Sequence, residues 1–332
     1  MRKTVQALSL LLFTAFFALA TYRLPDWLPA DIYLRIDPLL GINAVIASRE
    51  FIARVLWSLV LVGATLAVGR FFCAYVCPLG AAIDGFDFLF FRKVRRAVLQ
   101  NDSTLRRWKY VLLILFFTAA ATGVSLVYFM DPIALLTRFY TFFLYPLLIT
   151  IINILLDLFR PLFQGLGWVT PAHLHYPQPV FYMMAVTLII FGAVIALNRL
   201  APRFWCRYLC PLGALLSLIS PLGVFRRRVS AECNRCMVCQ KGCPMGAIGE
   251  DPFKTGSADC IQCRECVGIC PQKAISFSAS FSGVGEYSGV DLSRRGFVYS
   301  VGGGLTVGFL SLRTPITSLQ GRRQLIRPPG AL

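Results

Sequence analysis

Twelve cysteines fall into local patterns, and none is left over. Eight of them form two copies of one array, in which three cysteines spaced three residues apart are followed by a fourth cysteine and then a proline. The first array is Cys233, Cys236, Cys239, Cys243 and Pro244, and the second is Cys260, Cys263, Cys266, Cys270 and Pro271. Such dense thiols are ligands for iron or zinc, because this long chain is unlike the short secreted domains that use disulfide frameworks.

The doubled spacing is typical of bacterial ferredoxins with two [4Fe–4S] clusters. In that pattern three neighbouring thiolates bind one cluster, and the displaced fourth thiolate reaches the other cluster. One cluster is therefore expected on Cys233, Cys236, Cys239 and Cys270, and the other on Cys260, Cys263, Cys266 and Cys243. Zinc is the alternative, but zinc sites use two separated pairs of ligands, so the spacing favours iron and sulfide.

The remaining cysteines form two Cys-x3-Cys-Pro motifs, Cys73 with Cys77 and Cys206 with Cys210. Residues four apart lie on one face of a helix, so two such faces related by a repeat can bring four thiolates together. Three hypotheses are open: a third metal centre, a thiol redox pair, or contacts that relay electrons. The alternative is that these small polarisable side chains only pack near helix ends.

The composition indicates a membrane protein. Of 332 residues, 57% are hydrophobic and 15% are charged, and the mean hydropathy is +0.66. Four apolar stretches are long enough to span a bilayer, at residues 5–21, 52–72, 110–130 and 180–200. The first stretch lacks a small-residue cleavage site and is expected to remain as an anchor. A fifth stretch, 139–158, is interrupted by Tyr145-Pro146 and contains Asp157.

An internal repeat organises these stretches. Each unit runs through an apolar helix, an Asp-Pro pair, a second helix and then Cys-x3-Cys-Pro-Leu-Gly-Ala; the pairs are Asp37-Pro38 and Asp131-Pro132. Two spans per unit place both cysteine motifs on one side of the membrane, and a fifth span would invert the second motif. Residues 133–178 are therefore expected to form an interfacial or re-entrant insertion on the periplasmic side.

The net charge is +17, and the basic residues concentrate in segments 92–109 and 199–228, whereas 22–50 is balanced by acids. The positive-inside rule places both basic segments and the neighbouring cysteines in the cytoplasm of a multi-pass inner-membrane protein. Because this clustering follows topology, no nucleic-acid partner is expected. Positive charge at Arg235, Lys241 and Arg264 favours reduced clusters or an acidic partner.

Two further pairs of residues are candidates for chemistry. His173 and His175 could contact a quinone headgroup or bind metal, and the alternative is a solvated loop pair. Asp37 and Asp131 are expected to cap helices. The alternative for the aspartates is a proton exit for quinol oxidation.

The C-terminal region contains Ser293-Arg294-Arg295-Gly296-Phe297 before an apolar run. This pattern predicts a twin-arginine signal, with a simple basic anchor as the alternative. Since only 20 residues follow, the chain is expected to be truncated. The predicted units are a first membrane repeat, a basic loop, a second membrane repeat, a ferredoxin domain, a linker, the signal or anchor, and a stub; these are 1–92, 93–109, 110–228, 229–280, 281–292, 293–312 and 313–332.

The duplicated Cys-x3-Cys-Pro-Leu-Gly-Ala motifs, followed by the ferredoxin arrays, resemble the NapH/MauN family over residues 1–280. That resemblance implies an electron-transfer subunit of a quinol dehydrogenase, in contact with membrane lipid, that passes electrons from quinol to a periplasmic ferredoxin or cytochrome c-type acceptor. Residues 325–332 resemble the start of the exported NapG/MauM ferredoxin partner, which implies a fusion with a periplasmic C-terminal end.

Two alternative functions are open, and the FixG/CcoG proteins share the paired motif. FixG/CcoG-like assembly factors would use the Cys-x3-Cys pairs to handle copper, but they end in a β-sandwich domain. NosR-like regulators carry a flavin domain before the helices. The sequence thus predicts a polytopic α-helical membrane protein, with about four spanning helices in two repeats. It also predicts a small α+β ferredoxin domain with two [4Fe–4S] clusters and a C-terminal twin-arginine-like helix.

Overall fold

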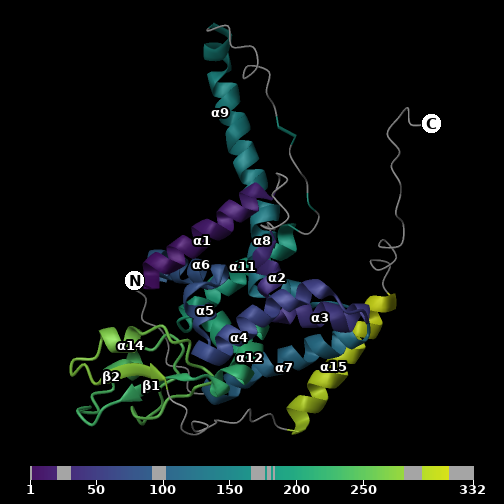
Figure 1. Cartoon of the computed structure of the whole chain (residues 1–332). Helices are drawn as coiled ribbons and strands as arrows, with labels where there is room; N and C mark the ends of the chain where they lie inside the picture. The colour runs from purple at the N-terminus through teal and green to yellow at the C-terminus, as the bar shows by residue number, and fades with distance from the viewer. Residues whose placement is uncertain are drawn as a thin grey trace.

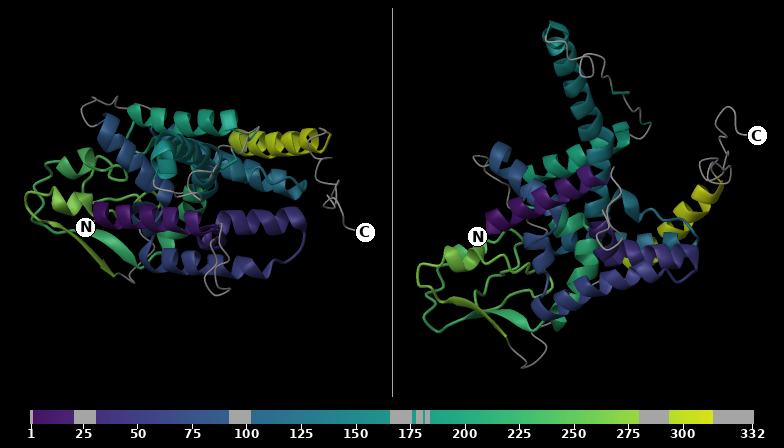
Figure 2. Two further views of the ribbon diagram at one scale, coloured as in Figure 1. Left: turned by 90° about the horizontal axis from the view of Figure 1, so that it is seen from above. Right: turned by 45° about the horizontal axis from the view of Figure 1, so that its top comes forward.

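The computed structural model describes residues 2–20, 31–91, 102–165, 176–177, 181, 184–279 and 294–313. Figure 1 shows a bundle of helices with a small two-stranded domain at one end. The two views of Figure 2 place this domain at one end of the long helices and the C-terminal helix at the other. His173, His175, Ser293, the linker 281–292 and nearly all of the predicted stub lie outside the described residues.

The first repeat is built from short and medium helices that follow the predicted order. They are α1 (Arg2–Leu19), α2 (Ile32–Ile36), α3 (Pro38–Ser48), η1 (Ala53–Trp57), α4 (Ser58–Val68), α5 (Phe71–Tyr75), α6 (Pro78–Phe86) and η2 (Asp87–Phe91). A proline begins both α3 and α6, where its missing N–H has no helical partner to lose.

The second repeat has the Asp-Pro helix and the cysteine motif in the same order, but it also contains the long helix α9 (Tyr145–Gly165). Its elements are α7 (Asp102–Ala121), η3 (Val127–Phe129), α8 (Pro132–Phe139), η4 (Tyr140–Leu144), α9, α11 (Met184–Ala196), η5 (Leu197–Arg199), η6 (Trp205–Leu209), α12 (Pro211–Ile219) and η7 (Ser220–Leu222). Helix α8 corresponds to α3, because each begins with a proline that follows a capping aspartate. Helix α12 corresponds to α6, because each begins with a proline that follows a capping cysteine.

In the part of the chain that the structure describes, two helices are long and apolar enough to cross a membrane, Arg2–Leu19 and Pro132–Arg160. The predicted spans 52–72 and 180–200 correspond to the shorter apolar helices Ala53–Val68 and Met184–Arg199. Helix α7 begins earlier than the predicted 110–130 span and ends at Ala121, before a turn at Gly123 with a φ of 89°. A count of four spans therefore remains a prediction.

The interruption expected at Tyr145-Pro146 does not occur. A π-helical turn, η4, precedes Pro146, and the helix continues through it for 29 residues in all. A wider turn accommodates the missing N–H of proline and the steric bulk of its ring. Helix α9 leaves the bundle at a steep angle to α1 and α7 (Figures 1 and 2).

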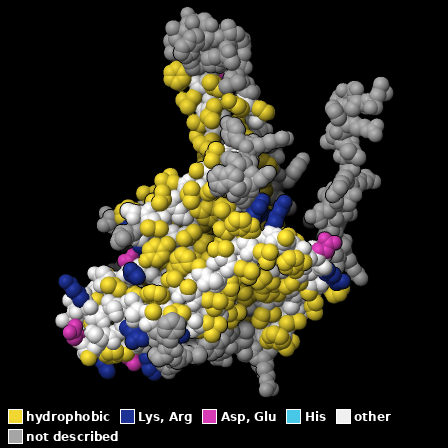
Figure 3. Space-filling model, in the orientation of Figure 1, with side chains coloured by type: hydrophobic (Ala, Val, Ile, Leu, Met, Phe, Trp, Pro, Cys, Tyr) yellow, Lys and Arg dark blue, Asp and Glu magenta, His cyan; other side chains and the backbone are white. Residues whose placement is uncertain are grey.

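Apolar side chains cover the outside of the bundle. Leu8 and Leu11 on α1, and Ile154 and Leu158 on α9, are each at least 60% exposed. Figure 3 shows this apolar surface continuing over the bundle and α9, whereas the small domain carries mixed polar and charged side chains. Extended exposed apolar surface is unfavourable in water, so these helices support a membrane protein.

The small domain has the expected α+β character. Strand β1 (Phe225–Val229) pairs antiparallel with β2 (Ile275–Ala279), in the register Phe225 to Ala279. Between them lie the short helices α13 (Val238–Lys241) and α14 (Glu265–Gly268). Strand β1 begins four residues before the predicted boundary at 229, because Arg226 to Arg228, interpreted as a topology signal, form part of the strand.

Helix α15 (Arg294–Arg313) packs along α7 through glycines. A Cβ at Gly304 would overlap the Thr118 side chain and lie 2.7 Å from the Leu115 carbonyl oxygen, and a Cβ at Gly308 would overlap Thr122. Small residues at this four-residue spacing let two helices approach closely in a membrane.

We expect Gly304→Val to displace α15 from α7, because the larger side chain cannot fit against Thr118. Cross-linking between cysteines introduced on the two helices should fall at least severalfold in this variant. Gly302→Val is the matched control, since no atom lies within 4 Å of a Cβ at Gly302. Equal cross-linking in both variants would contradict this packing.

Candidate metal centres

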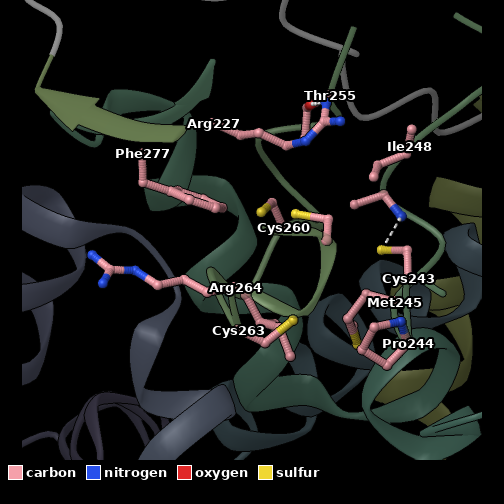
Figure 4. Close-up of a pocket in the computed structure, with 13 residues that line it drawn as sticks. Arg227, Cys243, Pro244, Met245, Ile248, Thr255, Cys260, Cys263, Arg264 and Phe277 are labelled. Carbon is pink, nitrogen blue, oxygen red and sulfur yellow. Dashed lines mark hydrogen bonds between the residues drawn. The ribbon is translucent and has the colours of Figure 1, made fainter. Parts of the chain in front are cut away.

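The structure brings Cys243, Cys260, Cys263 and Cys266 to the wall of one cavity. Figure 4 shows this cavity, with Cys243 approaching from one side and the second array from the other. We call it the inner cavity, because it is also lined by Met245 and Ile261, which belong to the core of the helix bundle. Three of its cysteines come from the second array and one from the first.

A second cavity, here called the outer cavity, has the reciprocal composition. Its cysteines are Cys233, Cys236, Cys239 and Cys270. Cys239 is buried in α13, whereas Cys236 is exposed. The two cavities thus group the cysteines as the spacing predicts, each with three thiols of one array and the fourth thiol of the other, and their role as cluster ligands stays a prediction.

Backbone geometry turns amides toward these thiols. The residues on either side of Cys236 and Cys263 have positive φ, between 54° and 59°: Arg235, Met237, Gln262 and Arg264. The amides of Gln262 and Glu265 donate to Cys260 and Cys263, and the Ala247 amide donates to Cys243 Sγ at 3.4 Å (Figure 4). Amides that converge in this way stabilise thiolate charge.

The arrangement fits iron–sulfur clusters better than a single ion. Among the described residues, no three His, Cys, Asp or Glu side chains lie close enough to hold one metal ion. A zinc ion needs four sulfurs about 2.3 Å from one point. A [4Fe–4S] cluster instead binds each thiolate at a different iron, so its ligands are spread around a cavity.

Arg227 contacts both cavities, a role that the sequence pattern did not predict. Its side chain lines the inner cavity, and its Nη2 lies 3.6 Å from Cys239 Sγ of the outer cavity. Its Nη1 donates to the Pro252 carbonyl oxygen at 2.7 Å and to Thr255 Oγ1 at 2.9 Å. Burial raises the pKa of the Cys266 thiol, and Arg227 opposes that shift. The only signal in the sequence was a basic residue on the strand next to the arrays.

The four cysteines of the Cys-x3-Cys-Pro motifs also come together. Cys73 lies in α5 and Cys206 in η6, while Cys77 and Cys210 are the N-caps of α6 and α12. All four are buried and interact electrostatically with one another. We call this group the four-thiol centre.

The four-thiol centre and the inner cavity share one apolar core. That core contains all four thiols together with Met245 and Ile261, and Cys243 and Cys263 pack against it. A separate, smaller core contains Cys239 of the outer cavity together with Cys266 of the inner cavity, and no thiol of the outer cavity belongs to the bundle core. The order from the bundle outward is therefore four-thiol centre, inner cavity and outer cavity.

Basic residues of the bundle dock the small domain. Asp259 accepts from Lys109 Nζ and pairs with Arg106, each at 2.6 Å. Burial acts to raise the pKa of Asp259, but Lys109 and Arg106 hold it well below its usual range. Burial also lowers the pKa of Lys109 to about 8, against the attraction of Asp259.

A second contact runs through the start of α1. Arg2 pairs with Asp84 of α6 and, at 2.8 Å, with Glu265 of the small domain. Asp84 also pairs with Arg203 at 2.8 Å. Burial acts to raise the pKa of Asp84, but Arg203 and Arg2 outweigh it and lower the pKa to about 2.

Asp37 and Asp131 cap helices, as expected. Asp37 Oδ1 accepts from the Leu39 amide at 2.8 Å, and Asp131 Oδ2 accepts from the Ala134 amide at 2.9 Å. Both residues are 0% exposed, and their carboxyl groups lie close enough to interact with each other. The repeat thus brings two buried acids into contact, which the sequence analysis did not predict.

Comparison with known families first defines a class of protein. A family described as "4Fe-4S binding domain" matches twice, at residues 51–97 and 183–230, once in each repeat. A family described as "4Fe-4S dicluster domain" matches residues 232–275. The chain therefore carries 4Fe–4S binding domains in both the helical bundle and the small domain. No solved structure matches the chain.

Comparison with curated proteins then shows which individual proteins the chain resembles. The chain is 25% identical over 205 residues to the ferredoxin-type protein NapH of Haemophilus influenzae, covering 59% of this chain and 57% of NapH. It is 25% identical over 214 residues to the methylamine utilization ferredoxin-type protein MauN of Paracoccus denitrificans, covering 63% and 60%. It is 28% identical over 184 residues to the putative electron transport protein YccM of Escherichia coli, covering 54% and 43%.

The predicted resemblance to NapH and MauN ferredoxin-type proteins is thus confirmed over more than half of the chain. The chain spans only 43% to 60% of the length of these three relatives. The predicted resemblance of residues 325–332 to NapG/MauM lies outside the described residues.

Proposed function

We propose that this chain is a membrane iron–sulfur protein that carries electrons from quinol to a periplasmic reductase system, as a subunit of a quinol dehydrogenase. The observation that supports this most strongly is the pair of cavities. Each cysteine array supplies three thiols to one cavity and its fourth thiol to the other cavity. A resemblance to ferredoxin-type proteins supports the same class.

The residues of each cavity would hold one [4Fe–4S] cluster. Cys260, Cys263, Cys266 and Cys243 would bind in the inner cavity, and Cys233, Cys236, Cys239 and Cys270 in the outer cavity. A bound cluster supplies one-electron redox chemistry. Phe277 and Ile248 exclude water from the inner site, while Arg227 and the converging amides favour the more negative, reduced state.

The membrane side of the proposal rests on the apolar outer surface and on the docking of the small domain. The inner cavity adjoins the core of the bundle, whereas Cys236 of the outer cavity is exposed. Electrons that move between the membrane and the small domain would therefore pass through the inner cavity, which lies nearer the bundle. The basic segments favour a cytoplasmic position for the small domain, and the resemblance implies a periplasmic ferredoxin or cytochrome c-type acceptor.

The function is tested by anaerobic purification in detergent, iron and sulfide analysis, and EPR during titration with a quinol analogue. The ferredoxin domain should contribute about eight irons per chain. Cluster signals should appear as quinol is added. Clusters that dithionite reduces but quinol never reduces would overturn quinol as the donor, while less than one cluster per chain would overturn the iron–sulfur assignment.

The interlocked ligand sets predict which substitutions share a phenotype. Cys270→Ala should perturb the same EPR signal as Cys236→Ala, because both thiols line the outer cavity. Cys243→Ala should instead group with Cys263→Ala, since both line the inner cavity. In each variant the other cluster's signal should stay at its wild-type intensity. If Cys270→Ala grouped with Cys263→Ala, each array would bind its own cluster and this assignment would be wrong.

A further inference from the structure

Two buried arginines cross between the repeats at the four-thiol centre. Arg70 and Arg203 hold equivalent positions, each three residues before the first cysteine of a motif. Arg70 is 0% exposed and Arg203 is 2% exposed. Arg203 donates from Nη1 to the Cys73 carbonyl oxygen at 2.8 Å. Arg70 reaches in the opposite direction, toward Cys210 and Gly213 of the second repeat. Each guanidinium therefore lies next to the cysteine motif of the other repeat.

The glycine of each Cys-Pro-Leu-Gly sequence makes room for this crossing. A Cβ at Gly213 would lie 2.9 Å from Arg70 Nη2 and 3.4 Å from Cys210 Sγ. A Cβ at Gly80 would lie 3.2 Å from the Cys73 carbonyl oxygen and 3.6 Å from Arg203 Nη2. The same glycines donate their amides to the thiols, Gly80 to Cys77 at 3.4 Å and Gly213 to Cys210 at 3.2 Å. The motif thus combines an amide donor with space for a cation.

The charges at this centre do not balance within the described residues. Arg203 has a carboxylate partner, because its Nε and Nη2 both donate to Asp84 at 2.8 Å. Arg70 donates from Nη1 to the Ala258 carbonyl oxygen at 2.9 Å, but its Nε and Nη2 have no partner there. The nearby carboxylate of Asp259 also attracts Arg70, but it already pairs with Lys109 and Arg106. A buried cation whose charge is not balanced is strongly unfavourable. Cys73 and Cys210 also interact with Arg70, so an anionic form of the four thiols would balance its charge.

We propose that Cys73, Cys77, Cys206 and Cys210 hold an iron–sulfur cluster between the two repeats, and that Arg70 and Arg203 neutralise its negative charge. Four thiolates give an iron–sulfur cluster net negative charge, which two guanidiniums and the two glycine amides offset. The 4Fe–4S binding match in each repeat contains one of the two cysteine pairs.

This centre extends the proposed electron path into the bundle, and the inference rests on the proposed function. Met245 and Ile261 line the inner cavity and belong to the same core as the four thiols, and Arg203 interacts electrostatically with Cys263 of that cavity. One electron passed from the centre to the inner cluster would oxidise the first and reduce the second. Quinol is the donor class that reduces the centre again: over two such steps one quinol becomes a quinone, giving two electrons to the centre and two protons to water.

The stoichiometry of iron tests the centre in the full chain purified anaerobically. Wild-type protein should contain iron and sulfide clearly above the about eight irons of two [4Fe–4S] clusters. The double variant Cys73→Ala/Cys206→Ala should lose that excess and keep both ferredoxin EPR signals. About eight irons in wild type, unchanged in the double variant, would overturn the third centre and leave the ferredoxin-based function standing. Copper or zinc in place of the excess iron would also overturn it.

The arginines are tested by the potential of the extra cluster. Arg70→Gln should lower the reduction potential of this cluster, because a positive charge that stabilises its reduced form is gone. The ferredoxin clusters should keep their potentials. Gly213→Ala should reduce the occupancy of the centre at least severalfold, because its methyl group meets Arg70 Nη2, whereas Gly63→Ala has no atom within 4 Å and serves as the control. An unchanged potential in Arg70→Gln would refute the role of the arginine.

Discussion

Asp259→Ala is expected to destabilise the docked small domain by about 3–5 kcal/mol, as expected when one partner of a buried ion pair is removed. Asp259 is only 17% exposed and faces Lys109, which is 0% exposed, and Arg106. Without the carboxylate these two cations lie close together, with little water to solvate them. Thermal unfolding of the holoprotein in detergent, followed by cluster absorbance, measures the loss.

The matched control is Glu250→Ala, because Glu250 is an exposed acid of the same domain. It should change stability little. The pH dependence has a definite sign, since the pKa of Asp259 is lowered in the folded protein. Its stabilisation is complete above the pKa of an unfolded aspartate and is lost as the pH falls toward the folded value. Equal destabilisation by both substitutions would contradict the role of the buried ion pair.

The sequence predicted the grouping of the cysteines at the two cavities and the helix caps because these depend on local spacing. The array spacing itself implies that Cys243 and Cys270 each join the cavity of the other array. An Asp directly before a Pro that begins a helix is a capping signal. The repeat also predicted that the four remaining cysteines could meet. Their meeting follows from the paired order of the elements, in which Cys77 and Cys210 begin equivalent helices.

What the sequence could not predict depends on which distant segments touch. Positive-inside signals and docking contacts use the same residue types, so Arg106 and Lys109 were assigned only to topology. Arg70 gave no separate signal, because its partners lie more than a hundred residues away. Pro146 was expected to interrupt its apolar stretch, but the π-helical turn before it keeps the helix continuous. Each of these outcomes is a tertiary arrangement that overrides a local pattern.

The paired acids Asp37 and Asp131 should hold one proton between them. A hydrogen bond between two carboxyl groups needs a proton on one of them, and two buried carboxylates in contact strongly disfavour double ionisation. Asp37 Oδ2 and Asp131 Oδ1 accept from no amide or other donor among the described residues, whereas the other oxygen of each acid caps a helix. The positive ends of α3 and α8 favour a single negative charge on the pair.

Two substitutions of Asp37 distinguish its role as a helix cap from its role in holding the shared proton. Asp37→Ala should destabilise the holoprotein by about 2–4 kcal/mol, because α3 loses its cap and Asp131 loses its partner. Asp37→Asn should have a much smaller effect, since its amide oxygen still caps α3 and its N–H2 group can donate to ionised Asp131. Unfolding by denaturant in detergent distinguishes the two variants.

Infrared spectroscopy then reports the proton directly. Wild-type protein at neutral pH should show the stretching band of a buried protonated carboxyl group, and deuterium exchange should shift it. The band should vanish in Asp37→Asn and in Asp131→Asn, because each variant leaves one carboxylate that an amide group satisfies. A band that persists in either single variant would show that the remaining acid carries its own proton. In that case the pair could not exchange a single shared proton, and a role in accepting protons from quinol would lose its structural basis.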